Sequence, residues 1–437
     1  MDSDFEEFLP TIDKVIISSL FVFTAFCMFS ISVTQIAAGI GGIAWFFRIY
    51  ITGDLRKQCW PLLIPFALFS LACIIAVIDA YDTSYAYKEL RKLLEILIFF
   101  WVVNCVRENH LKNYLSILLI TAAVLASSYG FYQGWRNGIN ISNRVEGTMS
   151  VYMTFAGMLM MVAMLALGRV LFRKPRESWM WIAIGIIFTC LLFTFTRQAW
   201  LGFFLGGLFL LFSLKKKLTL ILMGTLLTVL IVYGGQVRLK IMDMTTQWKT
   251  TLNDKGEQVK TKFNQTDKEI NFKSHIKLRI NSTLSGKQDD TFSMRVHLWR
   301  GGWEVFKDYP LTGCGFKCMD LIYAQYPDPT RIIQNLKGMH NNFIQLAMDT
   351  GILGLSTWIG IWVCFFGLLY KRIKSIKNQS EEWIVYGSSA SAIAFLVGGC
   401  FESSYYDSEI VMILYFIMAL PFSGPKTNPR LTSQPLI

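Results

Sequence analysis

Apolar runs about as long as a membrane is thick recur along most of this 437-residue chain. A helix needs roughly 20 apolar residues to cross a hydrocarbon core of about 30 Å, and short charged stretches separate the runs. Hydrophobic residues make up 53% of the chain and charged residues 16%, with a mean hydropathy of +0.41, which is outside the range of ordinary soluble domains. We therefore predict an all-α, polytopic membrane protein with about twelve transmembrane helices. The expected spans are 13–30, 33–50, 60–79, 92–106, 114–132, 150–168, 179–196, 199–214, 218–234, 343–370, 384–400 and 409–421.

The charged connections predict the orientation, because short cytoplasmic loops are enriched in Lys and Arg. Alternate connections are basic, and an even number of spans places both termini on that side, so we expect both termini to be cytoplasmic. Orientation then explains much of the net charge of +12, and no nucleic-acid partner is expected. The chain divides into helices 1 to 9 (residues 1–235), one large exoplasmic loop (236–342) and helices 10 to 12 (343–437). The basic connections contain Arg48, Arg56 and Lys57; Arg107 and Lys112; Arg169, Arg173, Lys174 and Arg176; Lys215, Lys216 and Lys217; and Lys371, Arg372, Lys374 and Lys377.

The large loop combines two kinds of sequence. Residues 245–290 are polar and mixed in charge, and they fit a disordered loop about as well as an ordered one. From Arg295 onward, apolar residues recur at helical spacing, which predicts a partly helical, amphipathic cap lying on the membrane. Cys314 and Cys318 share this loop, while most of the nine cysteines lie inside apolar spans. The pair could form a bridge on an oxidising face, but two unpaired loop cysteines are the more common case.

An arginine interrupts two apolar segments at the exoplasmic end of a span, in the stretch Thr194-Phe195-Thr196-Arg197-Gln198-Ala199-Trp200. A cation at this depth pairs with a partner, extends to the interface or binds a ligand, so Arg197 is a candidate functional residue. The alternative is an interfacial anchor beside Trp200.

Two further arginines, Arg295 and Arg300, bracket an aromatic stretch in the loop. A guanidinium group can bind two phosphate oxygens in a bidentate manner, and it keeps its charge at any relevant pH. These properties suit it to a diphosphate headgroup. Arginines near lipid phosphates also serve as plain anchors, so this pair alone is weak evidence.

A histidine, His340, stands where the polar loop re-enters the membrane, and Asn341 and Asn342 follow it. Imidazole, with an unperturbed pKa of about 6.5, can accept a proton from a hydroxyl near neutral pH. Either asparagine could orient the imidazole or a substrate. The alternative is that His340 is an ordinary solvated loop residue.

Taken in order, these stretches resemble the O-antigen ligase and polymerase superfamily. His340 and Asn341 are followed by nine residues and then Gly351-Ile352-Leu353-Gly354, as in the motif of bacterial O-antigen ligases. The Thr-x-Thr-Arg-x-x-Trp stretch around Arg197 matches too. So does the Arg-x-x-x-Trp helix that begins at Arg295, with Pro-Leu-x-Gly-x-Gly after it. Together the motifs cover about 160 residues.

The resemblance implies a glycosyltransferase of the bacterial inner membrane whose active site faces the periplasm. Its donor would be a glycan on undecaprenyl diphosphate, its acceptor lipid A-core, and it would need neither a metal nor another cofactor. The family's catalytic histidine falls on His340, and its two important arginines fall on Arg197 and Arg295. His340 would act as general base and the arginines would neutralise the diphosphate, with inversion at the anomeric carbon. Arg300 and Glu402 are further candidates for phosphate or sugar contacts, beside Asn341 and Asn342.

Two other hypotheses remain open at this point. A polysaccharide polymerase or a protein O-oligosaccharyltransferase of the same superfamily would use similar donors, and only the acceptor separates them from a ligase. A lipid-linked oligosaccharide transporter is of another class, and it would place charged residues inside several spans. Glu95 is the clearest charge within a span here, and the polar candidates gather on one predicted face. The absence of a paired-carboxylate motif in the exoplasmic loops agrees with a metal-independent transferase.

Overall fold

A computed structural model describes residues 8–139, 143–173, 177–214, 290–326, 338–375 and 381–424, and every regular element in these ranges is a helix. The fold is therefore that of an all-α polytopic membrane protein, as predicted. Its longer helices are α2 (Leu9–Phe26), α3 (Ile31–Thr52), α4 (Leu63–Ile78), α6 (Ile96–Cys105), α7 (Asn109–Asn137), α8 (Tyr152–Phe172), α9 (Met180–Phe193), α10 (Arg197–Leu214), α13 (Asp290–Asp308), α16 (Asn342–Ser375), α17 (Glu382–Gly398) and α18 (Ser408–Ala419). The short ones are η1 (Asp54–Lys57), α5 (Thr83–Tyr87), η2 (Lys88–Glu95), α14 (Met319–Ile322), η3 (Tyr323–Gln325), η4 (Ser404–Tyr406) and η5 (Leu420–Phe422).

The predicted spans can be compared with these helices one by one. Each overlaps a helix except 218–234, which lies outside the described residues. Six described helices are long and apolar enough to cross a membrane, and four more are apolar but shorter. The span expected at 92–106 differs, because its charged first residues belong to the 3₁₀-helix η2 and the α-helix begins only at Ile96. The total of about twelve spans stays a prediction.

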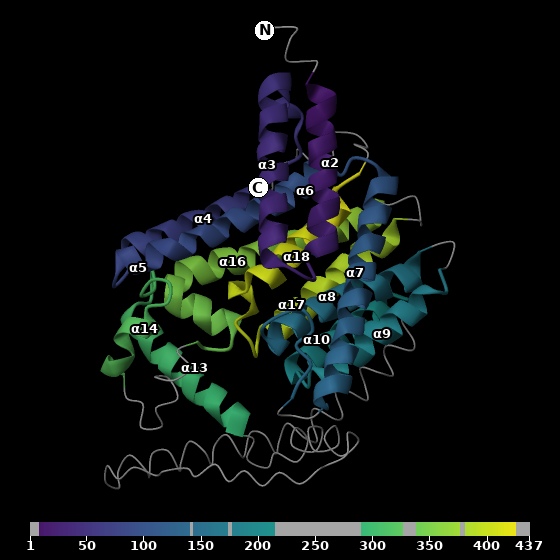
Figure 1. Cartoon of the computed structure of the whole chain (residues 1–437). Helices are drawn as coiled ribbons and strands as arrows, with labels where there is room; N and C mark the ends of the chain where they lie inside the picture. Colours follow the sequence, from purple (N-terminus) through teal and green to yellow (C-terminus); the bar gives the residue numbers. More distant parts are fainter. Residues whose placement is uncertain are drawn as a thin grey trace.

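Helix α8 lies at the centre of the bundle. It packs against α17, α10, α9, α18 and α7 (Figure 1), and 78% of its most apolar stretch is buried. The Ser391 hydroxyl of α17 donates to the carbonyl of Met161 at 2.8 Å. Small polar side chains of this kind let two helices approach closely and bond where no water is present.

The hairpin formed by α2 and α3 projects from the rest of the molecule, at the top of Figure 1. Only 28% and 22% of their apolar stretches are buried, and the outward side chains are large and apolar, with Ile43 71% exposed. A face of this composition suits lipid contact. Helix α4 runs alongside α16, and α13 packs below α16 (Figure 1).

The helix predicted from Arg295 onward is present as α13. Leu298 and Val305 are completely buried against Met339 and Met348, whereas Trp303 is 55% exposed and stacks on Phe306 at 5.2 Å between ring centroids. Helix α13 therefore packs on the protein and presents aromatic rings outward, where they suit a membrane interface. The segment 245–289 lies outside the described residues.

Candidate functional site

His340 is hydrogen-bonded to a carboxylate from a distant part of the sequence. Its Nδ1 lies 2.9 Å from Oε1 of Glu402, and the two side chains are 27% and 17% exposed. In a neutral imidazole whose proton is on Nδ1, toward the carboxylate, Nε2 is the nitrogen that can accept a proton. The pair therefore has the geometry of a general base and the group that orients it.

The backbone around His340 explains its position. Its φ of 46° lies in the left-handed region, which costs an L-residue about 1–2 kcal/mol and persists where neighbouring contacts enforce it. Immediately after it, the side-chain oxygen of Asn341 accepts from the backbone N–H groups of Phe343 and Ile344, at 2.9 and 3.1 Å. This is an N-cap, and it fixes where α16 begins. His340 therefore lies directly before the capped N-terminus of α16.

The two asparagines join α16 to the connection between α17 and α18. The Asn341 amide donates to the carbonyl of Cys400 at 2.8 Å. Asn342 is fully buried, and its side-chain oxygen accepts from the N–H of Tyr405 at 2.9 Å. Both amides are engaged in the scaffold, and a contact of Asn341 or Asn342 with substrate stays a prediction.

Glu402 also accepts hydrogen bonds from two other groups. The backbone N–H of Ser403 donates to Oε1 at 3.2 Å, and Nε2 of Gln198 donates to Oε2 at 3.4 Å. Gln198 follows Arg197 directly, so this contact connects the start of α10 with the His340–Glu402 pair. Glu402 thus faces His340, and its predicted contact with phosphate or sugar stays a prediction.

Arg197 is the first residue of α10, and the Thr-x-Thr-Arg-x-x-Trp stretch forms the turn that presents it. The Thr194 hydroxyl donates to the carbonyl of Leu191 at 2.7 Å, and Trp200 donates its indole N–H to the same carbonyl at 3.1 Å. Phe195, with a φ of 50°, is the second left-handed residue in the site region. An arginine at a helix N-terminus adds its charge to the positive end of the helix dipole, which favours an anion there.

Arg295 and Arg300 lie on α13, one of whose tryptophans contacts the histidine segment. The Trp299 indole N–H donates to the carbonyl of Met339 at 2.9 Å, and its ring lies 6.1 Å from that of Phe401. Arg295 precedes Trp299 by one helical turn and shares its face. Arg300 is rotated from Arg295 by about 140° around the helix axis. The Trp299 bond thus ties the Arg295 face of α13 to the segment that carries His340.

Two of the sequence motifs form one structural unit behind the histidine. Helix α16 breaks at Gly351, whose φ of 62° and ψ of −165° leave backbone groups without partners in the helix. The Pro-Leu-x-Gly-x-Gly loop supplies them: Ile352 donates to Pro310 at 2.9 Å, and Cys314 donates to Met348 at 3.0 Å. A Cβ atom at Gly351 would lie 2.2 Å from the carbonyl oxygen of Leu311. The glycines therefore permit a break in helix α16, and the loop provides hydrogen-bond partners for the backbone groups that the break exposes.

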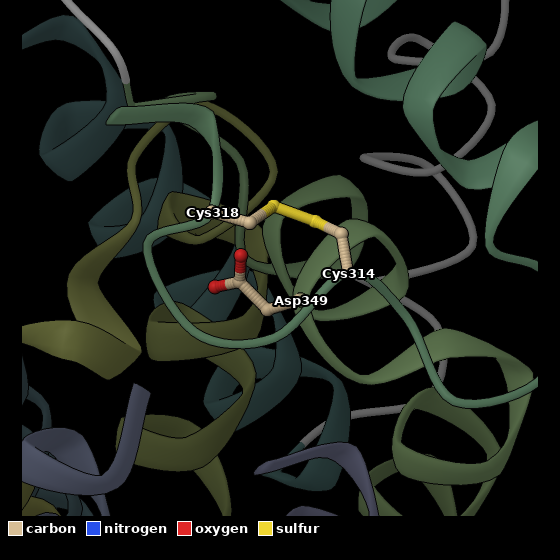
Figure 2. A group of neighbouring side chains, drawn as sticks. All are labelled: Cys314, Cys318 and Asp349. Atoms are coloured by element: carbon tan, nitrogen blue, oxygen red, sulfur yellow. A yellow bond between two sulfur atoms is a disulfide. The ribbon is translucent and has the colours of Figure 1, made fainter. Parts of the chain in front are cut away.

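A disulfide closes this loop, which settles the question left open for the two cysteines. Cys314 and Cys318 are bonded to each other beside Asp349 of α16, and all three are buried (Figure 2). The Asp349 carboxylate accepts from Nε2 of Gln345 at 3.2 and 3.1 Å. Although the three side chains come as close as metal ligands do, sulfur atoms bonded to each other are not thiolates, so they offer no metal site.

The connection before α18 carries further charge that sequence reasoning did not single out. Burial raises the pKa of Asp407 to about 6, and its carboxylate accepts from the Thr154 hydroxyl at 2.5 Å. Lys92 donates to the carbonyl of Tyr406 at 2.9 Å. Lys92 lies in η2, and its pairing across the fold could not be read from its neighbours in sequence.

The structure thus brings together some predicted residues through partners that were not predicted. His340 and Glu402 are in direct contact, Arg197 is linked to them through Gln198, and Arg295 through Trp299. Motif spacing could have indicated Trp299, which belongs to the Arg-x-x-x-Trp pattern. The pattern did not mark Gln198, because its importance comes from a residue 204 positions away.

Comparison with known proteins finds two partial matches. Residues 182–359 match the family model described as O-antigen ligase, a range that includes Arg197, Arg295 and His340. A stretch of 112 residues is 31% identical to the exopolysaccharide production protein ExoQ of Rhizobium meliloti (strain 1021), and it covers 24% of this chain and 25% of that protein. The chain thus matches only a quarter of the length of this relative. Its polytopic helical fold, its ordered motifs and the partial family match support a relationship of this chain to the O-antigen ligase and polymerase superfamily of membrane proteins.

Proposed function

We propose that this protein transfers a glycan from undecaprenyl diphosphate to a hydroxyl of lipid A-core, with inversion and without a metal ion. The observation that carries the proposal is the hydrogen bond between Nδ1 of His340 and Glu402, because it leaves Nε2 as a proton acceptor at a membrane-proximal site. The superfamily supplies the class of substrate, a lipid-linked glycan.

In the proposed step, Nε2 of His340 takes the proton of the acceptor hydroxyl as its oxygen attacks the anomeric carbon. The bond from that carbon to the diphosphate oxygen breaks, and undecaprenyl diphosphate leaves with the electron pair. Glu402 stabilises the imidazolium that forms, and the proton passes afterwards to solvent or to the leaving group. Because the acceptor attacks opposite the leaving group, the configuration at the anomeric carbon inverts.

The leaving group gains negative charge as the anomeric bond breaks, and the arginines would stabilise that charge. Arg197 combines its guanidinium with the N-terminus of α10, and Arg295 approaches from α13 on the face of Trp299. Arg300 would contact the phosphates or the glycan from the side of α13 that is turned away from Trp299. A cation pair of this kind performs the electrostatic part of the chemistry that a metal ion performs in other transferases.

The acceptor is the part of the proposal for which a second candidate has support. The partial identity with an exopolysaccharide production protein favours a polymerase, in which the acceptor is another polyprenyl-linked glycan. The general base and the diphosphate site would be the same in both enzymes. A protein acceptor and a transporter remain outcomes of the test below.

We place the site on the periplasmic face of the bacterial inner membrane, with both termini in the cytoplasm. A cysteine introduced near residue 270 tests this orientation. A membrane-impermeant thiol reagent is expected to label it in cells whose inner membrane is intact, and labelling only after that membrane is breached would refute the mechanism.

The deciding experiment is reconstitution with undecaprenyl diphosphate-linked glycan and purified acceptors, with product detected by a gel shift. His340→Ala is expected to lower kcat by about 10²- to 10⁴-fold, and Arg197→Ala or Arg295→Ala by about 10²- to 10³-fold. His110→Ala and Arg91→Ala, at exposed positions, are the matched controls. Normal turnover in His340→Ala would overturn the assignment. Product formed only on a second polyprenyl-linked glycan would identify a polymerase, product only on protein a protein transferase, and movement of intact donor without product a transporter.

A further inference from the structure

A cavity of about 410 Å³ lies between the C-terminal end of α7 and the segment that leads into α8. It is separate from the His340–Glu402 pair, and its volume falls within the range of roughly 300–1,000 Å³ typical of small-molecule sites. Its polar lining residues are Gln133, Asn137, Asn143, Arg144 and Glu146.

The walls of this cavity are fixed by hydrogen bonds and stacking. The side-chain oxygen of Gln133 accepts from the backbone N–H groups of Glu146 and Gly147, both at 3.0 Å. The Asn143 amide donates to the carbonyl of Asn137 at 3.1 Å. These contacts hold the 143–147 segment against α7, so the cavity is formed before any ligand binds, which reduces the entropy lost on binding.

Arg144 places the cavity beside the proposed transfer centre. The next residue, Val145, donates its N–H to the carbonyl of Phe193 at 3.3 Å, at the start of the turn that presents Arg197. The Arg144 guanidinium lies 4.4 Å from the centre of the Tyr152 ring. Burial lowers the pKa of Arg144, and the positive charge of Arg197 lowers it further, which agrees with the two arginines being neighbours.

The lining has the composition that binds sugar hydroxyls. Amides offer donors and acceptors in one plane, a carboxylate accepts, and a guanidinium donates, so together they can satisfy hydroxyl groups that both donate and accept. A lone phosphate would be repelled by the Glu146 carboxylate, whereas a saccharide can bond to it. We propose that this cavity is a saccharide-binding subsite, which holds sugar residues of a substrate glycan next to Arg197.

This inference rests on the proposed function, in which both substrates carry glycans, and the donor glycan and the acceptor core share the required chemistry. The test uses the full-length protein in detergent and two soluble ligands that cannot react. One is the oligosaccharide released from the donor without lipid or diphosphate, and the other is the core oligosaccharide without lipid A. Binding is measured by saturation-transfer NMR, and the arm that binds identifies the source.

The informative variants are Asn137→Ala and Glu146→Ala, because the bonds described above use the backbone of these residues and not their side chains. Each is expected to raise the Kd of the bound oligosaccharide about tenfold, the effect of one lost hydrogen bond to a ligand. Glu146→Gln keeps the shape of the lining and is expected to act in the same direction. Glu108→Ala, exposed at the opposite end of α7 about 40 Å away, is the matched control.

Binding of neither oligosaccharide, or an unchanged Kd in all three cavity variants, would overturn the proposal. Because the ligands cannot react, this result does not depend on turnover. A failed transfer assay together with normal saccharide binding would refute the transferase assignment and leave the subsite standing. Normal transfer with no saccharide binding would refute the subsite and leave the transferase assignment standing.

Discussion

Replacing Glu402 by Gln removes the negative charge of the side chain that contacts His340 but keeps its size and shape. In the variant an amide oxygen can still accept from Nδ1, and Gln198 can rotate its own amide to face the new NH₂ group, so the geometry is retained. What disappears is the attraction between the carboxylate and the imidazolium that forms in the transition state. At a charge separation of about 4 Å and an effective dielectric constant of 20, that attraction is about 4 kcal/mol.

The proton is only partly transferred in the transition state, so between about half and all of this energy is lost. A loss of about 2–4 kcal/mol corresponds to a fall of roughly 30- to 10³-fold in kcat. Because Glu402 does not touch the donor in the proposed mechanism, the KM for the donor is expected to change less than about threefold.

The assay is steady-state transfer by the reconstituted protein, with kcat and KM measured separately for donor and acceptor. Glu382→Gln is the control, since it alters the same residue type at the opposite end of α17, about 25 Å from Gly398. The reasoning fails if Glu402→Gln retains a normal kcat while His340→Ala is inactive. It also fails if the whole effect appears in the KM for the donor, which would return Glu402 to the diphosphate or sugar contacts first expected for it.

Three further predictions concern the scaffold and are checked by thermal unfolding in detergent. Gly351→Ala should destabilise by about 3 kcal/mol, since alanine disfavours a φ of 62° and its Cβ would meet a carbonyl, whereas Gly360→Ala, with open space on the same helix, should not. Cys314→Ser should cost about 2 kcal/mol and make stability insensitive to reductant; an unchanged sensitivity would exclude this disulfide as its source. Burial of Glu89 opposes its ionisation, but ion pairs, including one to Lys317 at 2.7 Å, outweigh it and lower the pKa below 4.5. That stability is present above pH 4.5 and is lost as the pH falls below it, so Glu89→Gln should flatten the acid limb of a plot of stability against pH.

The sequence allowed the helices to be predicted, because each is an apolar run interrupted by charged or turn-forming residues. It also marked His340 and Arg197 as candidates, since a charged or titratable side chain at the end of a span needs a reason to be there, and Arg295 through its motif in the loop. Local spacing does not identify the surface on which a helix packs. The spacing indicated α13, but the burial of Leu298 and Val305 depends on a partner surface that belongs to α16.

The partner of His340 could not be predicted, because it depends on tertiary contact and not on periodicity. Glu402 is 62 residues from His340 and 204 from Gln198, and its own neighbourhood marked it as a candidate for phosphate or sugar contacts but not as the partner of a histidine. Asn341, which follows His340, was predicted to contact substrate because its local sequence fits two roles. An N-cap and a substrate contact both need a short polar side chain before a helix, so Asn341 satisfies either pattern.

The loop and the helix break that follow His340 in space explain why glycine-rich motifs without reactive side chains accompany the motifs that carry histidine and arginine. His340 keeps a left-handed backbone only if α16 starts at a fixed place, and α16 can start there and still break at Gly351 only if other groups take up its unpaired backbone atoms. The loop from Pro310 to Gly315 provides these partners, and the disulfide at Cys314 restrains it. The same loop follows α13 directly, so one short segment sets both the distance of the Arg295 helix from the membrane spans and the position of the histidine. A change in this loop should therefore alter the binding of diphosphate and the transfer of the proton together, although it touches neither group.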